Sequence, residues 1–410
     1  MPYFKTLFKN IFGLGSINII NLIIPIIIIP ILSRTISSND YGYILYITTL
    51  QLFSAIFLDY SFNITSVKEY ITSNNKVRRN VIFIETQLSR LLLMLIYSFI
   101  VLFYTIMIGY NIYDIIYYII PFSLAHILIS PWLYQAKCQL SIMGTVLFFS
   151  RVVHLILILV YKDNKNIDSI VLISQTYTYL LSGLILFYIS RNNYILCFKS
   201  KRKTLVLLRV KEKLLNSLPL FIADFSPNLY TNIPAILLID FINKAIYFQY
   251  NIAIKVVGIG LMLQSIISRA FFPILCKDKN INQKIVFCIN ILPTLLFITP
   301  TILFSNHLFF IITGQSSILF QEYMVILSIG MFFGVLGSYL GQNFLLVKTD
   351  GRKYSKVIVI SCVISGIIGL FIVPIYTDFG AIWLLTIGRF FFFIGCFYCF
   401  LEYKRQQNYV

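Results

Sequence analysis

Twelve long apolar segments, separated by short polar connections, follow one another along the chain. They are expected at residues 11–33, 41–62, 81–108, 113–134, 141–161, 167–190, 214–239, 247–273, 282–304, 318–346, 354–374 and 380–401. Each has about 20 residues or more, the length that an α-helix needs to cross a hydrocarbon core of about 30 Å. The segments are apolar on nearly all sides, whereas a surface helix of a soluble protein keeps one polar face. The pattern therefore predicts an all-α, polytopic membrane protein with twelve transmembrane helices.

The longest polar interruption is strongly basic and divides the segments into two sets of six. It covers residues 191–213. We therefore expect an N-terminal six-helix lobe at residues 1–190, a basic cytoplasmic linker at 191–213, and a C-terminal six-helix lobe at 214–410. Two equal halves are typical of transporters that work by alternating access. Because the connections on the side opposite the linker are short, no folded extracytoplasmic domain is expected.

The basic residues predict the orientation of the helices. If both termini and every second connection face the cytoplasm, those regions hold 25 of the 33 Lys and Arg residues, and the opposite connections hold four. This bias follows the positive-inside rule and predicts that both termini lie in the cytoplasm. The net charge of +18 follows from the same rule, so it indicates anionic lipids as partners and no nucleic acid. A hydrophobic content of 59% and a mean hydropathy of +0.85 agree with a membrane protein.

Five ionisable side chains are expected deep in the membrane, about 12–15 Å from the helix ends. They are Arg90, Arg151, Asp224, Lys255 and Arg389. Such groups are costly in a bilayer unless they face a cavity or a partner, so each is a candidate functional residue. One carboxylate cannot neutralise four cations. The excess of positive charge predicts a cationic central cavity in which Arg90, Arg151, Lys255 and Arg389 bind an anionic substrate.

A second interpretation of two of these cations stays open. Arg90 and Arg389 can instead extend toward the membrane surface or pair locally, for example Arg90 with Glu85.

The expected helix at 214–239 carries the clearest polar stripe. Asp224, Asn228 and Asn232 are spaced four residues apart and therefore share one face. Pro227 and Pro234 interrupt the same helix and permit a kink. The stripe predicts polar substrate contacts from Asn228 and Asn232, with Asp224 as the candidate for ion coupling. Alternatively, the Asn side chains bridge to neighbouring helices.

Other polar residues within expected helices are weaker candidates. Asn18 and Asn21 share a face of the first helix and are candidate substrate contacts. Asp59, near the end of the second helix, is a candidate for gating, or it caps the helix or pairs with Lys68. His154, one turn from Arg151, either carries a proton or makes an ordinary polar contact.

No catalytic, metal-binding or phosphate-loop motif occurs in the sequence, so we expect neither a cofactor nor an enzyme activity. Cys396 and Cys399 form a C-x-x-C within an expected helix and are interpreted as packing residues. Gly330, Gly334 and Gly337 indicate a close helix–helix contact.

Several short motifs resemble those of Wzx-type flippases. Residues 32–43 read LSRTISSNDYGY and residues 58–63 read LDYSFN, where the family commonly has a Gly in place of Ser61. Residues 131–136 read PWLYQA, similar to the Trp-x-x-Gln element of the family. In the second half, LYTN at 229–232, Ala253-x-Lys255 and Phe272-Pro273 also fit. There Gln249-Tyr250 departs from the usual Gly-Tyr pair.

The resemblance implies membership of the multidrug/oligosaccharidyl-lipid/polysaccharide exporter superfamily, with two six-helix lobes around a central cavity. The implied substrate is a polyprenyl-pyrophosphate-linked oligosaccharide, which moves to the outer leaflet for O-antigen or capsule assembly. A polysaccharide polymerase and a chain-length regulator are candidate partners. The anionic pyrophosphate agrees with the excess of buried cations.

Three other functions remain open. A multidrug antiporter shares the architecture, although cationic drugs favour an acidic cavity. An O-antigen polymerase, which is an enzyme, is expected to have a large extracytoplasmic loop. A lipid II flippase is expected to have fourteen helices.

Overall fold

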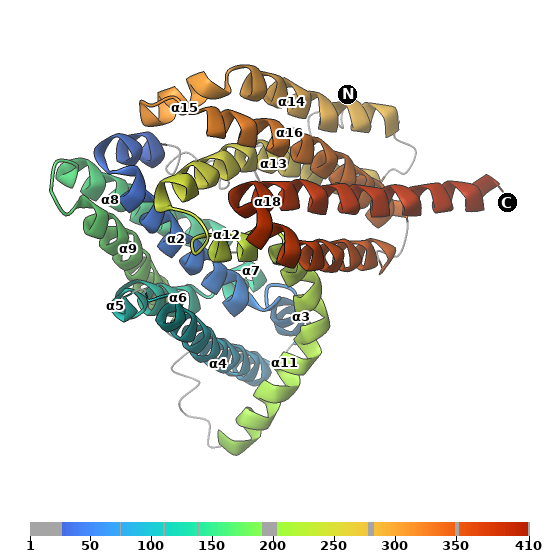
Figure 1. Ribbon diagram of the computed structural model, residues 1–410. Helices are drawn as coiled ribbons and strands as arrows, with labels where there is room; N and C mark the ends of the chain where they lie inside the picture. The colour runs from blue at the N-terminus through green and yellow to red at the C-terminus, as the bar shows by residue number, and fades with distance from the viewer. Residues whose placement is uncertain are drawn as a thin grey trace. The chain divides into compact units, whose positions relative to one another are not determined.

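The computed structural model is helical along nearly all of the chain that it describes, which comprises residues 27–73, 75–109, 111–137, 139–190, 203–277, 283–348 and 352–408 (Figure 1). Within these residues, nine helical stretches are long and apolar enough to cross a membrane. The predicted all-α, polytopic fold is confirmed. The count of twelve helices stays a prediction, because most of the expected segment at 11–33 lies outside the described residues.

The last two expected helices form one long stretch with a kink. α18 extends over Arg352–Asn408, and Thr377 within it has a non-helical backbone with φ 49° and ψ −119°. Pro374 lies one turn before this point, and proline removes a backbone hydrogen bond from a helix. Since the kink falls between the expected helices at 354–374 and 380–401, α18 provides both of them.

The expected helix at 214–239 is broken, as its prolines predict. α11 (Lys203–Phe225) is followed by the 3₁₀ turn η2 (Ser226–Leu229), which contains Pro227, and then by the short helix α12 (Asn232–Leu238). Because the residues between α11 and α12 are not α-helical, the polar side chains of this segment lie on separate structural elements.

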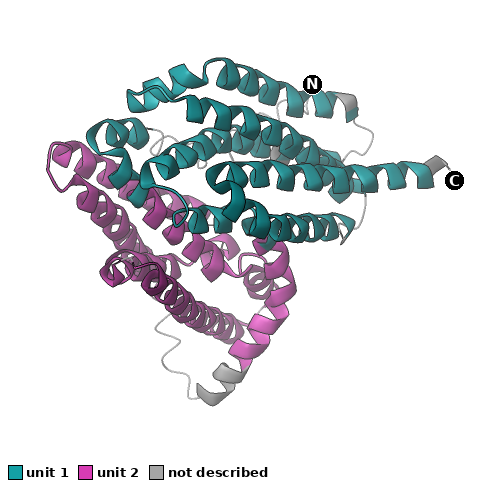
Figure 2. Ribbon diagram, viewed as in Figure 1, with its two compact units in different colours: residues 1–43, 226–410 teal, residues 44–225 magenta. Residues whose placement is uncertain are grey.

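Contacts within the chain define two compact units (Figure 2). Unit 2 comprises residues 44–225, and unit 1 comprises residues 1–43 and 226–410. These boundaries differ from those of the predicted lobes at 190 and 214, because α11 packs against α4 (Lys76–Ile108) in unit 2. The division into two lobes joined by a basic linker stays a prediction, and residues 191–202 of that linker lie outside the described residues.

Unit 2 contains most of α2 and the elements that follow it as far as α11. Their bounds are α2 Ser38–Asp59, α3 Thr65–Thr72, α4 Lys76–Ile108, α5 Ile112–Asp114, η1 Ile115–Ile119, α6 Ile120–Ile129, α7 Pro131–Ala136, α8 Leu140–Tyr161, α9 Ile167–Ile189 and α11 Lys203–Phe225. α6 and α8 both pack against α9. The side-chain oxygen of Asn75 accepts a hydrogen bond from the backbone N–H of Val77 at 2.8 Å and thereby caps α4.

Unit 1 contains the remaining elements, in which α16 packs against both α13 and α18. Their bounds are η2 Ser226–Leu229, α12 Asn232–Leu238, α13 Lys244–Lys277, α14 Gln283–Leu303, α15 Ser305–Thr313, α16 Ile318–Ser338, the π-helix η3 Tyr339–Leu345, α17 Leu346–Lys348 and α18 Arg352–Asn408. Cys396 and Cys399 are buried in a hydrophobic cluster with residues of α13, α14 and η3. Both cysteines therefore pack within the core of this unit.

Glycines of α16 allow α18 to approach closely. A Cβ atom at Gly330 would lie 2.9 Å from the Cα of Thr386, and one at Gly337 would lie 2.6 Å from the ring of Phe392. Neither distance is compatible with a larger side chain unless α18 moves. The predicted packing role of these glycines is confirmed.

Gly330→Ala is expected to destabilise unit 1 by about 1–3 kcal/mol, because the added methyl group overpacks the contact between α16 and α18. The matched control is Gly258→Ala in α13, where a Cβ atom has no neighbour within 4 Å. That change is expected to stabilise the helix by roughly 0.5–1 kcal/mol. Thermal unfolding of the two purified variants in detergent checks this prediction. Equal unfolding temperatures would contradict it.

Candidate functional site

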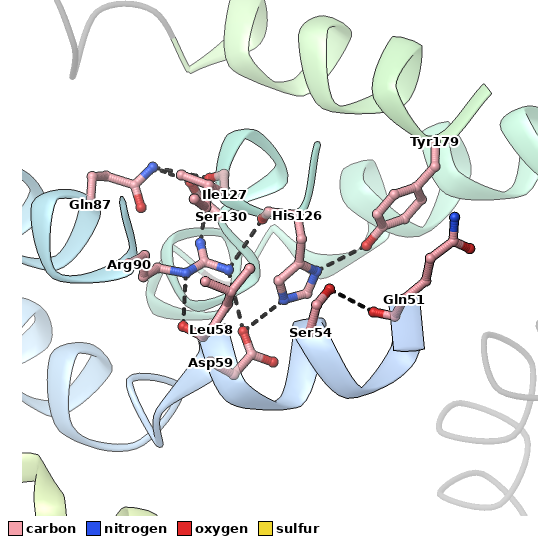
Figure 3. A network of polar contacts seen from close by, with 10 residues as sticks. All are labelled: Gln51, Ser54, Leu58, Asp59, Gln87, Arg90, His126, Ile127, Ser130 and Tyr179. Atoms are coloured by element: carbon pink, nitrogen blue, oxygen red, sulfur yellow. Dashed lines mark hydrogen bonds and ion pairs between the residues drawn. The ribbon is translucent and has the colours of Figure 1, made fainter. Parts of the chain in front are cut away.

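A polar network lies inside unit 2, where four helices bring ionisable side chains together (Figure 3). α2 ends at Asp59, α4 carries Arg90, α6 carries His126 and α9 carries Tyr179. Two sharp turns lie next to this network. Tyr60 and Ser61, directly after α2, have φ of 41° and 56°, and Ser130, directly after α6, has φ of 50°. These turns end α2 and α6, so the last carbonyl groups of both helices are available as acceptors.

Arg90 is fully buried and binds the ends of both helices. Its Nη2 lies 3.3 Å from Oδ1 of Asp59 and donates to the backbone oxygen of His126 at 3.2 Å. Nε donates to the backbone oxygen of Leu58 at 3.3 Å, and Nη1 donates to that of Ile127 at 3.4 Å. Because helix C-termini carry partial negative charge, the guanidinium neutralises these carbonyl groups as well as Asp59.

His126 extends the network from Asp59 to α9. Its Nε2 lies 2.9 Å from Oδ1 of Asp59, and its Nδ1 lies 3.0 Å from the hydroxyl of Tyr179. If Nε2 carries the proton, it donates to the carboxylate and Nδ1 accepts from Tyr179. In this arrangement Asp59 accepts from both Arg90 and His126. Gln87 completes the network by donating to Ser130 Oγ at 2.8 Å.

Local pairing of Arg90 thus occurs, but its partner is Asp59. Glu85 lies 3.8 Å from Arg78 and 3.5 Å from Arg209. Arg90 follows Glu85 by five positions on α4, so their side chains point about 140° apart around the helix axis. That geometry explains why the pair Arg90–Glu85 does not form.

Asp224 lies near the end of α11 and is exposed. Its Oδ2 accepts a hydrogen bond of 2.6 Å from Ser61, two residues after Asp59. Lys213, also on α11, forms a 2.9 Å ion pair with Glu69 of α3. These contacts join α11 to the polar turn at the end of α2 and to the short helix α3.

Arg151 and His154 lie on α8, one turn apart. Arg151 is partly exposed, and the Nδ1 of His154 lies 2.8 Å from the hydroxyl of Ser174 on α9. This hydrogen bond agrees with the second interpretation of His154, an ordinary polar contact. The other two candidates of the first half, Asn18 and Asn21, lie outside the described residues.

The two predicted cations of unit 1 have different surroundings. Lys255, on α13, is partly buried and has neither a hydrogen bond nor an ion pair with any described residue. Arg389, on α18, packs its methylene groups on α16, with Cδ 3.3 Å from the Cβ position of Gly334. Its Nη1 is buried and has no hydrogen-bond partner among the residues that the structure describes. Within the described chain, neither cation is neutralised by a carboxylate.

Asn228 and Asn232 lie in the broken segment of unit 1, which packs against α18. The side chain of Asn232 donates to Oδ1 of Asn228 at 2.6 Å. Between them, Leu229 lies 3.2 Å from the Cβ position of Gly366, and the ring of Tyr230 lies 2.5 Å from that of Gly388. Gly388 precedes Arg389, so the two asparagines lie on elements that contact the helix of this cation.

Two polar clusters were not anticipated from the sequence. One is His126 with its partners, and the other is Asp378, which accepts hydrogen bonds from Tyr323 and Thr377 within unit 1. His126 is a polar residue in an otherwise apolar segment, and this feature of the sequence could have identified it as a candidate. Asp378 falls in the short connection between the last two expected helices, where an acidic residue is ordinary.

The protein is thus a polytopic helical protein in which Asp59 neutralises the buried Arg90. Two other cations, Lys255 and Arg389, have no carboxylate partner in the described chain. This is the architecture of a membrane transport protein. The chain belongs to the polysaccharide biosynthesis protein family, whose model matches residues 7–279.

Relatives and solved structures agree with this assignment. A protein of Shigella dysenteriae named for O-antigen transport is 23% identical over 280 residues, which cover 66% of this chain and 67% of that protein. The capsular polysaccharide biosynthesis protein CapF of Staphylococcus aureus is 25% identical over 412 residues, covering 97% and 99%. The predicted resemblance to polysaccharide exporters is confirmed.

The fold is similar to two solved membrane proteins. The lipid II flippase MurJ in its inward closed conformation has a TM-score of 0.72 at 12% identity, covering 94% of this chain and 86% of MurJ. An inward-facing multidrug resistance MATE transporter of the MOP superfamily has a TM-score of 0.64 at 11% identity, covering 94% and 99%. These similarities confirm the predicted MATE-like fold.

Proposed function

We propose that the protein is a flippase that moves polyprenyl-pyrophosphate-linked oligosaccharide repeat units from the cytoplasmic to the outer leaflet for O-antigen or capsule assembly. The observation that carries this proposal is the pair of cations, Lys255 and Arg389, that have no carboxylate partner in the described chain. Holding such charges at membrane depth is costly unless an anion binds them during the working cycle. Family membership and the names of the relatives support a substrate of polysaccharide assembly.

The pyrophosphate matches these two side chains. A guanidinium and an ammonium group both form short, charge-assisted hydrogen bonds with phosphate oxygens, and these are about twice as strong as neutral ones. Arg151 is a further candidate for this role. Arg90 is now better interpreted as a structural residue, since its charge is balanced by Asp59 and by helix-end carbonyl groups.

Asn228 and Asn232 are proposed to hydrogen-bond the glycan. Amide groups donate and accept at once, as the hydroxyl groups of sugars require. The hydrogen bond from Asn232 Nδ2 to Asn228 Oδ1 holds the two amide side chains together.

Asp59 and Asp224 are proposed to act in gating or ion coupling. Asp59 is held between Arg90 and His126, whereas Asp224 is exposed and bound by Ser61. A change in the charge of either carboxylate alters the contacts at the end of α2. Such a local change can bias an alternating-access equilibrium if its contacts differ between the two states.

Translocation breaks no covalent bond, so we propose that the protein is not an enzyme. The charge pattern supports cytoplasmic termini, and the bacterial relatives support a location in the bacterial inner membrane. Anionic lipids, a polysaccharide polymerase and a chain-length regulator are the proposed partners.

Removing the gene from its host tests the function. We expect complete lipid-linked repeat units to accumulate on the inner leaflet, because their synthesis continues while their export stops. Surface polysaccharide is expected to disappear. The measurement is the amount and the leaflet of extracted lipid-linked units, with the complemented strain as the control. Single units that reach the outer surface but stay unpolymerised would show that the protein acts in polymerisation instead.

A further inference from the structure

An apolar cavity of about 650 Å³ lies in unit 1, outside the candidate site. Its walls come from α14, from the end of α16, from the π-helix η3 and from the second half of α18. Chain direction alternates between these elements, so the start of α14, η3 and the end of α18 lie at the same end of unit 1 (Figure 1). The hydroxyl of Tyr339 donates to the backbone oxygen of Gln283 at 3.1 Å, which joins η3 to the start of α14. We call this cavity the η3 groove.

The η3 groove is polar at one end and apolar along the rest. Gln283, the first residue of α14, and Lys404, near the end of α18, line it at the end of the helices, while Leu336 and Phe393 line it deeper in the unit. Phe393 and Lys404 are eleven residues apart, which corresponds to about 16 Å along the helix. One leaflet of a bilayer contributes about 15 Å of hydrocarbon. The groove therefore has the length and the polarity gradient of a single membrane lipid.

Gln283, which lines the η3 groove, carries a buried hydrogen-bond donor without an acceptor among the described residues. Nε2 of Gln283 is inaccessible to solvent and has no partner among the described residues, although Oε1 of the same side chain lies 3.3 Å from the hydroxyl of Tyr339. Leaving such a donor unsatisfied is costly, so an acceptor from a bound molecule would stabilise it. Lys404 adds a positive charge at the same end, with its Nζ 4.8 Å from the centre of the Phe400 ring. Both groups favour an anionic head with acceptor oxygens.

The π-helical backbone of η3 forms part of the groove wall. Tyr339, Leu340 and Phe344 all come from this seven-residue π-helix. π-Helical turns are rare and occur frequently at functional sites. Their use here agrees with a binding role for this wall.

We propose that the η3 groove binds one acyl chain of an anionic phospholipid, with the phosphate at Lys404 and an ester or phosphate oxygen accepting from Gln283. A cavity of about 650 Å³ has room for an acyl chain along its apolar lining. Water is a poor occupant because the lining is apolar. This proposal does not depend on the transported substrate.

Cys288 provides a direct probe, since it lines the η3 groove and is exposed. The full-length protein is placed in nanodiscs of phosphatidylcholine alone, or of phosphatidylcholine with phosphatidylglycerol, and is treated with a maleimide. Peptide mass spectrometry then gives the labelling rate at Cys288 itself. We expect phosphatidylglycerol to slow labelling about fivefold, the effect of one basic side chain near an anionic lipid.

Three variants distinguish this site from a general effect of surface charge. Lys404→Gln removes the phosphate contact, and Leu336→Trp fills the apolar end. Both are expected to abolish the protection by phosphatidylglycerol. Arg405→Gln is the matched control, because it removes an exposed charge that does not line the groove, and it is expected to keep the protection.

Equal labelling of the wild-type protein in both lipid mixtures would overturn the proposal. Full protection in Lys404→Gln would overturn it as well. If polyprenyl phosphate added to phosphatidylcholine discs protects Cys288 while phosphatidylglycerol does not, the groove binds a carrier lipid and the acyl-chain assignment is wrong. Lys404 is exposed, so loss of folding in Lys404→Gln is not expected to obscure the result.

Discussion

Lys255→Gln is expected to abolish surface polysaccharide while the amount of protein in the membrane stays unchanged. Lys255 has no hydrogen bond or ion pair to any residue that the structure describes, so its replacement by Gln breaks no polar contact among those residues. The loss is expected in substrate binding, because a charge-assisted hydrogen bond to phosphate is worth about 1.5–3 kcal/mol, or roughly 10- to 150-fold in affinity. Surface polysaccharide and immunoblots of the membrane fraction give the two quantities.

Two control variants accompany this change. Lys255→Arg keeps the positive charge and is expected to retain part of the activity. Lys244→Gln removes a charge at the start of the same helix, where the Lys244 ammonium lies 4.7 Å from the centre of the Tyr43 ring, and normal polysaccharide is expected. Normal polysaccharide in both Lys255→Gln and Arg389→Gln would refute the role of these cations.

Arg90→Gln is expected to have the opposite signature, with a large loss of stability and of membrane abundance. The side chain is fully buried and contacts Asp59 and three helix-end carbonyl groups, all of which would lose a donor. Breaking a buried ion pair from one side costs about 3–5 kcal/mol. The partly exposed position of Asp59 places the expected value near the lower limit, at about 3 kcal/mol. Thermal unfolding of the purified protein measures this effect.

A double-mutant cycle with Asp59→Asn separates the ion pair from the carbonyl contacts. In the Asp59→Asn background, Arg90→Gln is expected to cost less, since no carboxylate is left without its partner. His126→Gln is the matched comparison, because it removes the second donor to Asp59 and leaves Arg90 in place. If Arg90→Gln had wild-type stability but no transport, Arg90 would instead be assigned to substrate binding.

Hydrophobic patterning predicted the helices well because the lipid environment imposes one simple rule on each segment. An apolar stretch of sufficient length becomes a helix, since its backbone polar groups have no other partners in the bilayer. The kink at Thr377 and the break at Pro227 also follow local chemistry, and both fall where connections or prolines predicted them. These features depend on neighbouring residues in the chain.

Partners distant in sequence could not be predicted in the same way. Asp59 and Arg90 are 31 residues apart, and Asp59 and His126 are 67 apart, so their contact depends on how α2, α4 and α6 pack. Counting charges identified Arg90 as a buried cation but could not show that helix-end carbonyl groups also neutralise it. The same limit applies to Lys255 and Arg389, whose lack of a carboxylate partner in the described chain became visible only in the structure.

Transport by the purified protein tests the central claim most directly. The protein is reconstituted into liposomes that contain fluorescent polyprenyl-pyrophosphate-linked oligosaccharide, and a membrane-impermeant reagent reports the labelled lipid in the outer leaflet. We predict that the wild-type protein moves this lipid between leaflets, that Lys255→Gln does not, and that a polyprenyl lipid lacking the pyrophosphate is not moved. Equal movement of the lipids with and without pyrophosphate would contradict a flippase that recognises its substrate through buried cations.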